Sequence, residues 1–258
     1  MLNALERFAP LPLQESYDNA GLQIGLTEAE VSGALLCLDV TEEIVEEAIR
    51  KGCNLIVSHH PLIFRKLAHI SDENYVQRTV LKAIKNDIAI VAMHTNMDAA
   101  EGGVNFKIAE KLGLQNIQFI GKQQEAGNNV KGGEGILGES AEPMAADDLV
   151  LQVRKTFEVE CVQCNQLLRR EIRKIALCGG AGSFLLDEAI AAGADAFITG
   201  EMSYHDFFGH DQQIQICVIG HYQSEQFTME IFQDIINKEC PGVKTEITEI
   251  NTNPIIYL

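Results

Sequence analysis

The chain has 258 residues, of which 46% are hydrophobic and 22% are charged, values typical of a soluble globular protein with one large or two modest domains. It carries 20 Lys and Arg against 37 Asp and Glu, and this acidic balance disfavours general binding to DNA or RNA, whose affinity comes mainly from cationic side chains on phosphates. The first ten residues have no apolar run of signal-peptide length, and no stretch approaches the ~18 apolar residues of a membrane span, so we expect a cytoplasmic protein without membrane contact.

Short apolar runs alternate with amphipathic segments of helical length. From the N-terminus we expect, in turn, a strand at 31–40, a helix at 41–52, a strand at 54–60, a helix at 76–87, a strand at 88–98 and a helix at 104–113. A polar, glycine-rich stretch at 121–135 is the best linker candidate. Beyond it we expect strands at 172–180, 194–201, 214–222, 244–250 and 254–258, with helices at 183–193 and 224–238. This alternation favours an α/β fold with largely parallel sheets.

An internal repeat links the two halves. Residues 34–60 align with 175–201 at an offset of 141, which places Cys37 on Cys178, Gly52 on Gly193 and Asn54 on Asp195. HTNMD at 94–98 falls on HYQSE at 221–225, at an offset of 127. Two generic β-α-β units could share this pattern. A true repeat predicts two domains of like topology, 1–121 and 122–258, whose interface is a natural ligand site.

Histidines and carboxylates follow several of the expected strands. His59 and His60 adjoin at the end of one strand, and His-x-x-x-acid units follow two others. The simplest alternative is a turn with solvated imidazoles. Because neighbouring residues of an extended chain point to opposite faces, one metal would find it hard to take both imidazoles, whereas two metals could take one each. If Glu225 begins the helix after its strand, the four-residue spacing brings it onto the face of His221.

Two other motifs carry weaker signals. Seven cysteines, an odd number, do not suggest a disulfide framework, and Cys161 and Cys164 form a lone CxxC motif. A structural zinc site would need a second such pair and a redox motif a thioredoxin-like setting, so we favour no functional role for this pair. GGAGS at 179–183 could hold a phosphate at a helix start, but a tight turn explains its glycines equally well.

These blocks resemble one family. They are SHHPLIF at 58–64, HTNMD at 94–98 with Gly102, Gly103 and Asn105, ADAFITGE at 194–201, and Gly220 and His221 with Glu225, supported by NAGLQIG at 19–25 and DVT at 39–41. The chain is similar over nearly its whole length to the dinuclear-metal-centre hexameric proteins, also known as GTP cyclohydrolase I type 2 homologues or NIF-three-like proteins.

The resemblance implies a metal site and an assembly. Two divalent ions, with Zn, Mn and Fe all acceptable, would be bound by the residues that match the family's ligands: His59, His60, Asp98, His221 and Glu225. It also implies two interlinked three-layer α/β/α domains of similar topology and a toroidal homohexamer. Tyr17 and Asp18 stand where a tryptophan–acid pair is common, and residues 133–138 lead into the second half without room for the middle domain of longer relatives.

Hydrolysis is the reaction that such a site favours, because paired metals activate water and polarise carbonyl or phosphoryl oxygens. We therefore expect a metal-dependent hydrolase of a nucleotide or related heterocycle, with GTP cyclohydrolase or phosphoesterase activity. Glu201 and His205 are candidate acid–base residues that could equally be structural, and His94 could orient Asp98. The alternatives are a metal-binding protein without turnover and an oligomeric adaptor for a protein or a single-stranded nucleic acid, the latter disfavoured by the acidic balance.

Overall fold

The computed structural model describes residues 1–126 and 129–256, which form two compact units. The first unit is formed mainly by Met1–Ala100 and Thr228–Ile256, and the second by Glu101–Glu125 and Lys131–Phe227. The chain passes from the first unit into the second at Glu101, returns briefly to the first around Ala126 and Val130, and returns to it again at Thr228, so neither unit is one continuous segment. This division differs from the boundary at residue 121 suggested by the sequence, because the C-terminal segment supplies a helix and a strand to the first unit.

The first unit is built on a five-stranded sheet with the order β1-β4-β3-β2-β11. Its strands are β1 (Gly21–Ile24), β2 (Gly33–Cys37), β3 (Leu55–Ser58), β4 (Ala89–Ala92) and β11 (Lys244–Ile247). Four of them run parallel, and β1 pairs antiparallel with β4 at one edge. Strands β2 and β3 are buried at every position, as expected for parallel strands covered by helices on both faces.

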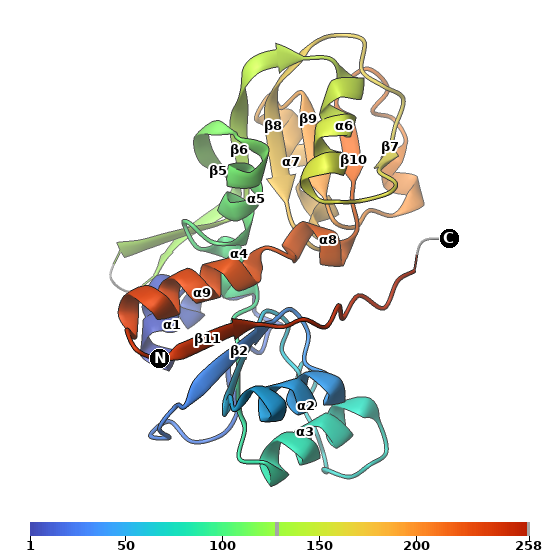
Figure 1. The fold of residues 1–258 in the computed structure, drawn as a ribbon. Helices are drawn as coiled ribbons and strands as arrows, with labels where there is room; N and C mark the ends of the chain where they lie inside the picture. The colour runs from blue at the N-terminus through green and yellow to red at the C-terminus, as the bar shows by residue number, and fades with distance from the viewer. Residues whose placement is uncertain (127–128, 257–258) are drawn as a thin grey trace. The chain divides into compact units, whose positions relative to one another are not determined.

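Helices cover this sheet. The larger ones are α1 (Leu2–Phe8), α2 (Glu42–Lys51), α3 (Tyr75–Lys85) and α9 (Thr228–Glu239). Helices α2 and α3 contact each other and the central strands, whereas α1 and α9 pack together against β1, β2 and β11 (Figure 1). Thr41 caps α2 by accepting a hydrogen bond from the Ile44 amide, and Gly52 ends it in the left-handed conformation, so the helix matches the one predicted at 41–52.

The second unit has a six-stranded sheet with the order β5-β6-β8-β9-β10-β7. Its strands are β5 (Gln115–Ala126), β6 (Val130–Met144), β7 (Gln163–Cys164), β8 (Ile172–Cys178), β9 (Ala196–Thr199) and β10 (Gln215–Val218). Strands β8, β9 and β10 are parallel, whereas the β6–β8 and β10–β7 pairs are antiparallel. Both sheets are therefore mixed. Neighbouring helices are α5 (Val104–Leu112), α6 (Ala146–Thr156), α7 (Leu186–Ala191) and α8 (His221–Glu225).

The linker predicted at 121–135 is wrong, because its described residues lie mainly in β5 and β6. The glycines that suggested a flexible connection instead permit close packing. A Cβ atom on Gly133 would meet the Phe119 ring at 2.6 Å, and one on Gly135 would meet Leu185 at the same distance. Glycine within a strand is typical of such close approaches.

The repeat is present in the strand registers. Ala34 pairs with Leu55 in the first sheet, and Ile175 pairs with Ala196 in the second, which reproduces the offset of 141. The next strands, β4 and β10, correspond at an offset of 126, since Ala89 and Gln215 donate to equivalent carbonyls. Gly220, whose φ is 98°, adds one residue before His221 and restores the offset of 127 seen in the sequence. Each unit therefore repeats one β-α-β pattern.

Several expected elements differ in extent. The strand expected at 88–98 ends at Ala92, and α4 (Thr95–Ala99) follows it. The helix expected at 224–238 is divided between α8 and α9. Residues 254–256 are not in a strand, and the rest of the strand expected at 254–258 lies outside the described residues. Helices α1 and α6 and strand β1 were not predicted.

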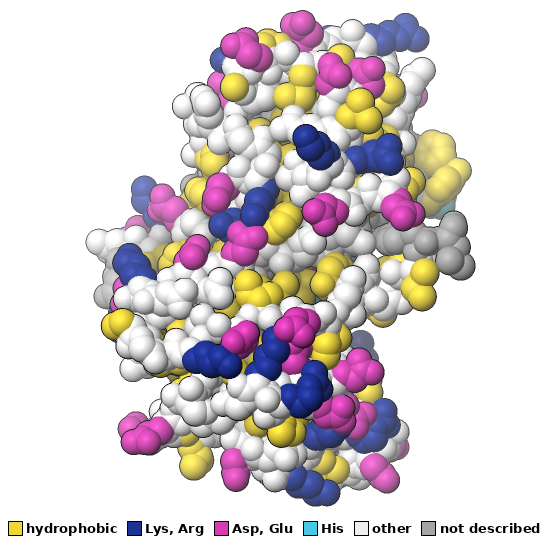
Figure 2. All heavy atoms as spheres, viewed as in Figure 1, with side chains coloured by type: hydrophobic (Ala, Val, Ile, Leu, Met, Phe, Trp, Pro, Cys, Tyr) yellow, Lys and Arg dark blue, Asp and Glu magenta, His cyan; other side chains and the backbone are white. Residues whose placement is uncertain are grey.

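Two surface properties bear on partners. Lys and Arg side chains are interspersed with Asp and Glu on the face shown in Figure 2. Within residues 1–126 and 129–256, no helix is long and apolar enough to cross a membrane.

Candidate metal centre

The first unit gathers three histidines beyond the carboxyl ends of β3 and β4. His59 and His60 directly follow β3, and His94 precedes the first residue of α4. The candidate ligand nitrogens of these three residues all lie within 4.8 Å of one another. Ligands bind at this edge of parallel sheets because the strand ends present their following loops to a common space. The fold thus brings three nitrogen donors together.

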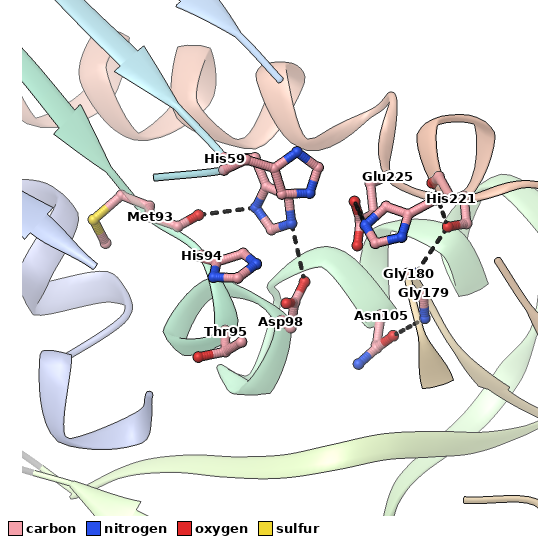
Figure 3. Close-up of polar contacts among 12 residues, drawn as sticks. His59, Met93, His94, Thr95, Asp98, Asn105, Gly179, Gly180, His221 and Glu225 are labelled. Atoms are coloured by element: carbon pink, nitrogen blue, oxygen red, sulfur yellow. Dashed lines mark hydrogen bonds and ion pairs between the residues drawn. The ribbon is translucent and has the colours of Figure 1, made fainter. Parts of the chain in front are cut away.

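Each of these rings is held at Nδ1 by an oxygen. The Nδ1 atom of His59 lies 2.9 Å from the carbonyl of Met93 (Figure 3). His60 Nδ1 lies 2.8 Å from Asp39 Oδ1, and His94 Nδ1 lies 2.7 Å from Asp18 Oδ1. A carbonyl or carboxylate oxygen accepts a hydrogen bond, so the ring proton belongs on Nδ1 and the lone pair on Nε2. Metal-binding histidines are commonly oriented in this way.

The two aspartates at these rings are held in their charged form. Burial raises the pKa of Asp18, but the hydrogen bond from His94, together with that from Thr95, outweighs burial and lowers that pKa to about 2. Burial also raises the pKa of Asp39, but hydrogen bonds from His60 and from the Thr252 hydroxyl outweigh it and lower that pKa. The Thr252 hydroxyl donates to Oδ2 at 2.8 Å. Each aspartate therefore remains a hydrogen-bond acceptor for its imidazole.

Asp98 adds a carboxylate to this set. It lies on α4, and its Oδ1 is 3.5 Å from Nε2 of His59 (Figure 3). The contact involves the ring nitrogen opposite the Met93 carbonyl, which is the nitrogen that carries the lone pair. The expected role of His94 in orienting Asp98 stays a prediction, since the hydrogen bond described for the His94 ring is to Asp18.

The expectation that His59 and His60 point to opposite faces is wrong. Strand β3 ends at Ser58, so neither histidine lies in the extended segment where side chains alternate. Their ring centroids are only 4.9 Å apart, with the planes tilted by 49°. The two imidazoles are therefore close enough to serve one metal or two adjacent metals.

The second unit presents its own donors on α8, directly after β10. Nε2 of His221 lies 3.2 Å from Oε2 of Glu225, the i,i+4 arrangement that the sequence predicts. The other ring nitrogen, Nδ1, lies 2.9 Å from Oε1 of Glu201. Glu201 thus holds His221 as Asp39 holds His60, and these two acids occupy different positions in the repeat.

The glycine-rich turn after β8 supports the Glu225 side chain. Gly180 adopts a φ of 57°, and a Cβ atom there would collide with Glu225 Oε1. The amide of Gly179 donates to Asn105 Oδ1 at 2.9 Å (Figure 3). The amide of Gly180 donates to Ser224 Oγ at 2.9 Å. Because side chains already accept from these amides, the turn positions α8, and the phosphate-binding interpretation loses support.

His205 lies on a different element from these donors. It is exposed on the short helix η4 (Tyr204–Phe207), and its ring packs against Tyr204 and Phe208, with centroids 5.2 and 6.1 Å away. Its role as an acid–base residue stays a prediction.

Comparison with known proteins now gives the family. A family model described as Duf34/NIF3 (NGG1p interacting factor 3) matches residues 1–254. The chain belongs to the Duf34/NIF3 family. It is 32% identical over 227 residues to a protein of Clostridium acetobutylicum named GTP cyclohydrolase 1 type 2 homolog, covering 87% of this chain and 84% of the relative. A Clostridium perfringens protein of the same name is 34% identical, with 87% and 85% covered.

Solved structures agree with the Duf34/NIF3 assignment. A Staphylococcus aureus hypothetical protein has a TM-score of 0.90 at 30% identity, covering 100% of this chain and 97% of that one. A Bacillus cereus protein described as related to NIF3 has a TM-score of 0.87 at 26% identity, covering 99% and 97%. Curated S. aureus relatives align over 363 positions, more than the 258 residues of this Duf34/NIF3 chain.

The donor chemistry of this Duf34/NIF3 chain fits divalent ions such as Zn, Mn or Fe. Imidazole nitrogen and carboxylate oxygen suit all three. Among the described residues, the candidate metal-binding groups contain His, Asp and Glu and no cysteine. Sequence reasoning did not assign Asp18 and Asp39 as partners of the histidines, although Asp39 follows a buried strand, the same signal that singled out His59.

Proposed function

We propose that this protein binds two divalent metal ions per chain and uses them to hydrolyse a nucleotide or related heterocycle. The observation that carries the proposal is the oxygen acceptor at Nδ1 of each of four histidines: His59, His60, His94 and His221. One buried histidine with a hydrogen bond is an ordinary structural feature. Four rings with the same nitrogen engaged, each near further donors, indicate selection for Nε2 coordination.

We further propose that the donors of both units serve one dinuclear centre, as family resemblance implies. Charge supports this proposal. The first unit offers three imidazoles and the single carboxylate of Asp98, which is little negative charge for two dications. The second unit offers His221 with the carboxylate of Glu225. Pooling the two sets adds a second carboxylate ligand, which offsets more of the charge of two dications.

Bound divalent ions would supply activated water and polarisation of a carbonyl or phosphoryl oxygen. The protein's own groups would fix the direction of the donors: Asp39 and Glu201 hold the rings of His60 and His221, and the turn at Gly180 confines Glu225. The name shared by the relatives, GTP cyclohydrolase 1 type 2 homolog, makes GTP the first substrate to test.

The test is turnover by metal-reconstituted protein across a panel of nucleotides and phosphoesters. We expect hydrolysis of at least one member, and we expect Glu225→Gln to lower its rate at least ~10²-fold while circular dichroism stays unchanged. Glu188→Gln, the same substitution at an exposed position of α7, is the matched control. Equal rates for wild type and Glu225→Gln would assign the activity to another site. No turnover with any metal would favour a non-catalytic metal-binding protein.

We also propose that the chain assembles as a toroidal homohexamer in the cytoplasm, on the strength of the family resemblance. Light scattering should give six times the 28.4 kDa chain mass. A stable monomer across micromolar concentrations would contradict the assembly.

A further inference from the structure

Two cysteines face each other across an edge of the second sheet. Strand β7 pairs antiparallel with β10, and Cys164 lies directly opposite Cys217. Facing residues of antiparallel strands have Cα atoms about 4.5 to 5.5 Å apart, within the range that a disulfide spans. Facing residues of an antiparallel pair direct their side chains to the same face of the sheet, so the two thiols are neighbours. Little backbone movement would therefore be needed to join them.

The two thiols differ in access and in acidity. Cys217 is completely buried, whereas Cys164 is partly exposed and lines a cavity of about 470 Å³. The hydrogen bond from Cys217 lowers the pKa of Cys164 despite partial burial, and the same interaction, with full burial, raises the pKa of Cys217. The thiolate, which is the reactive form, therefore develops on the accessible sulfur.

We propose that Cys164 and Cys217 are a reversible redox pair that forms a cross-strand disulfide on reaction with a hydroperoxide such as hydrogen peroxide. The Cys164 thiolate attacks the peroxide, so that an S–O bond forms, the O–O bond breaks, and hydroxide leaves as water. Cys217 sulfur then attacks the Cys164 sulfenic acid, so that the S–S bond forms, the S–O bond breaks, and a second water leaves with the Cys217 proton. The two thiols lose two electrons and the peroxide gains them.

The pairing differs from the one that the CxxC motif suggests. Cys161 is exposed, three residues before Cys164. Cys217 has the advantage that the strand register already holds it opposite Cys164, so its attack requires no rearrangement of the loop that carries Cys161. Cys161 therefore serves as an internal control for the partner of Cys164.

The disulfide would tie the edge strand β7 to β10. Strand β10 is the element that leads through Gly220 to α8, but Cys217 itself lies outside the donor contacts described for that helix. The proposal thus stands without the metal-centre proposal, and its test measures thiols rather than turnover.

The experiment oxidises the reduced full-length protein with graded hydrogen peroxide and maps its peptides by mass spectrometry without reductant. We expect a Cys164–Cys217 cross-link in the wild type and in Cys161→Ser, its absence in Cys164→Ser, and its reversal by a dithiol. Cys217→Ala, checked for folding by circular dichroism, should leave Cys164 as a sulfenic acid that dimedone traps. A Cys161–Cys164 cross-link, or irreversible oxidation of Cys164 with Cys217 still a thiol in the wild type, would overturn the proposal. The wild-type map decides even if Cys217→Ala does not fold.

Discussion

Glu201 Oε1 lies 2.9 Å from Nδ1 of His221, on the opposite side of the ring from the Glu225 contact at Nε2. This contact indicates that Glu201 orients the His221 ring. Its expected role as an acid–base residue stays a prediction that kinetic measurements would test. The Glu201 contact also parallels the contact between Asp39 and His60 in the first unit.

Glu201→Gln should therefore weaken metal binding without unfolding the protein. The amide can still accept at its oxygen, but the negative charge that favours the Nδ1 proton and strengthens the ligand is lost. Removing such a partner typically lowers metal affinity about 10- to 100-fold. Competition with a fluorescent chelator measures the affinity, and Glu171→Gln, at an exposed position of the same unit, is the control. Affinities equal to wild type in both variants would exclude the positioning role.

Gly180→Ala should impair the metal centre through a collision with Glu225. Gly180 and Gly193 both have positive φ, at 57° and 75°, so alanine at either position strains the backbone by roughly 1 kcal/mol. Only at Gly180 would the new Cβ meet the Glu225 carboxylate, because no atom lies within 4 Å of a Cβ on Gly193.

The two variants separate strain from collision. We expect similar small losses of unfolding free energy, measured by urea titration, with weakened metal binding in Gly180→Ala alone. Weakened binding in Gly193→Ala to the same degree would show that general destabilisation, not the Glu225 contact, is responsible.

Asp195 should make stability depend on pH. Burial raises its pKa, but hydrogen bonds from the Lys174 and Arg173 amides and the Arg170 ion pair outweigh burial, so the folded-state pKa lies below the ordinary value of 3.8. Its stabilisation is therefore present above pH 3.8 and is lost as the pH falls through the folded-state pKa.

Asp195→Asn is a conservative test, because Asn54 occupies the equivalent repeat position and its Oδ1 accepts from the Ser32 amide at 2.9 Å. We expect the variant to lose roughly 1 kcal/mol of unfolding free energy near neutral pH, since the partly exposed ion pair adds little to the hydrogen bonds. The difference from wild type should shrink as the pH falls below 3.8. A difference that stays constant down to acidic pH would argue against the carboxylate as its source.

Local sequence signals predicted much of the repeated β-α-β framework. Thr41 caps the start of α2, and Gly52 ends the helix in a left-handed conformation. Both effects depend on neighbouring residues alone. The spacing of His221 and Glu225 likewise sufficed to place them on one helical face. These features were accessible because their determinants lie within a few residues of each other.

Features that depend on tertiary contacts could not be predicted from the sequence. Glycines in β6 looked like linker residues because their packing partner, such as Phe119 for Gly133, lies on another strand. Asp18 is 76 residues from His94, and nothing local marks it as that ring's acceptor. His59 and His60 do not alternate across a strand, because β3 ends at Ser58, two residues before the expected end at His60.

The number of metal ions bound per chain distinguishes a dinuclear centre from a single-metal site. The protein is stripped of metal with a chelator, reconstituted with excess Zn or Mn, freed of unbound ions and analysed for metal per chain by elemental mass spectrometry. Our account predicts two tightly held equivalents, one for each metal of a dinuclear centre built from imidazole and carboxylate donors. A consistent single equivalent, or none, would contradict it.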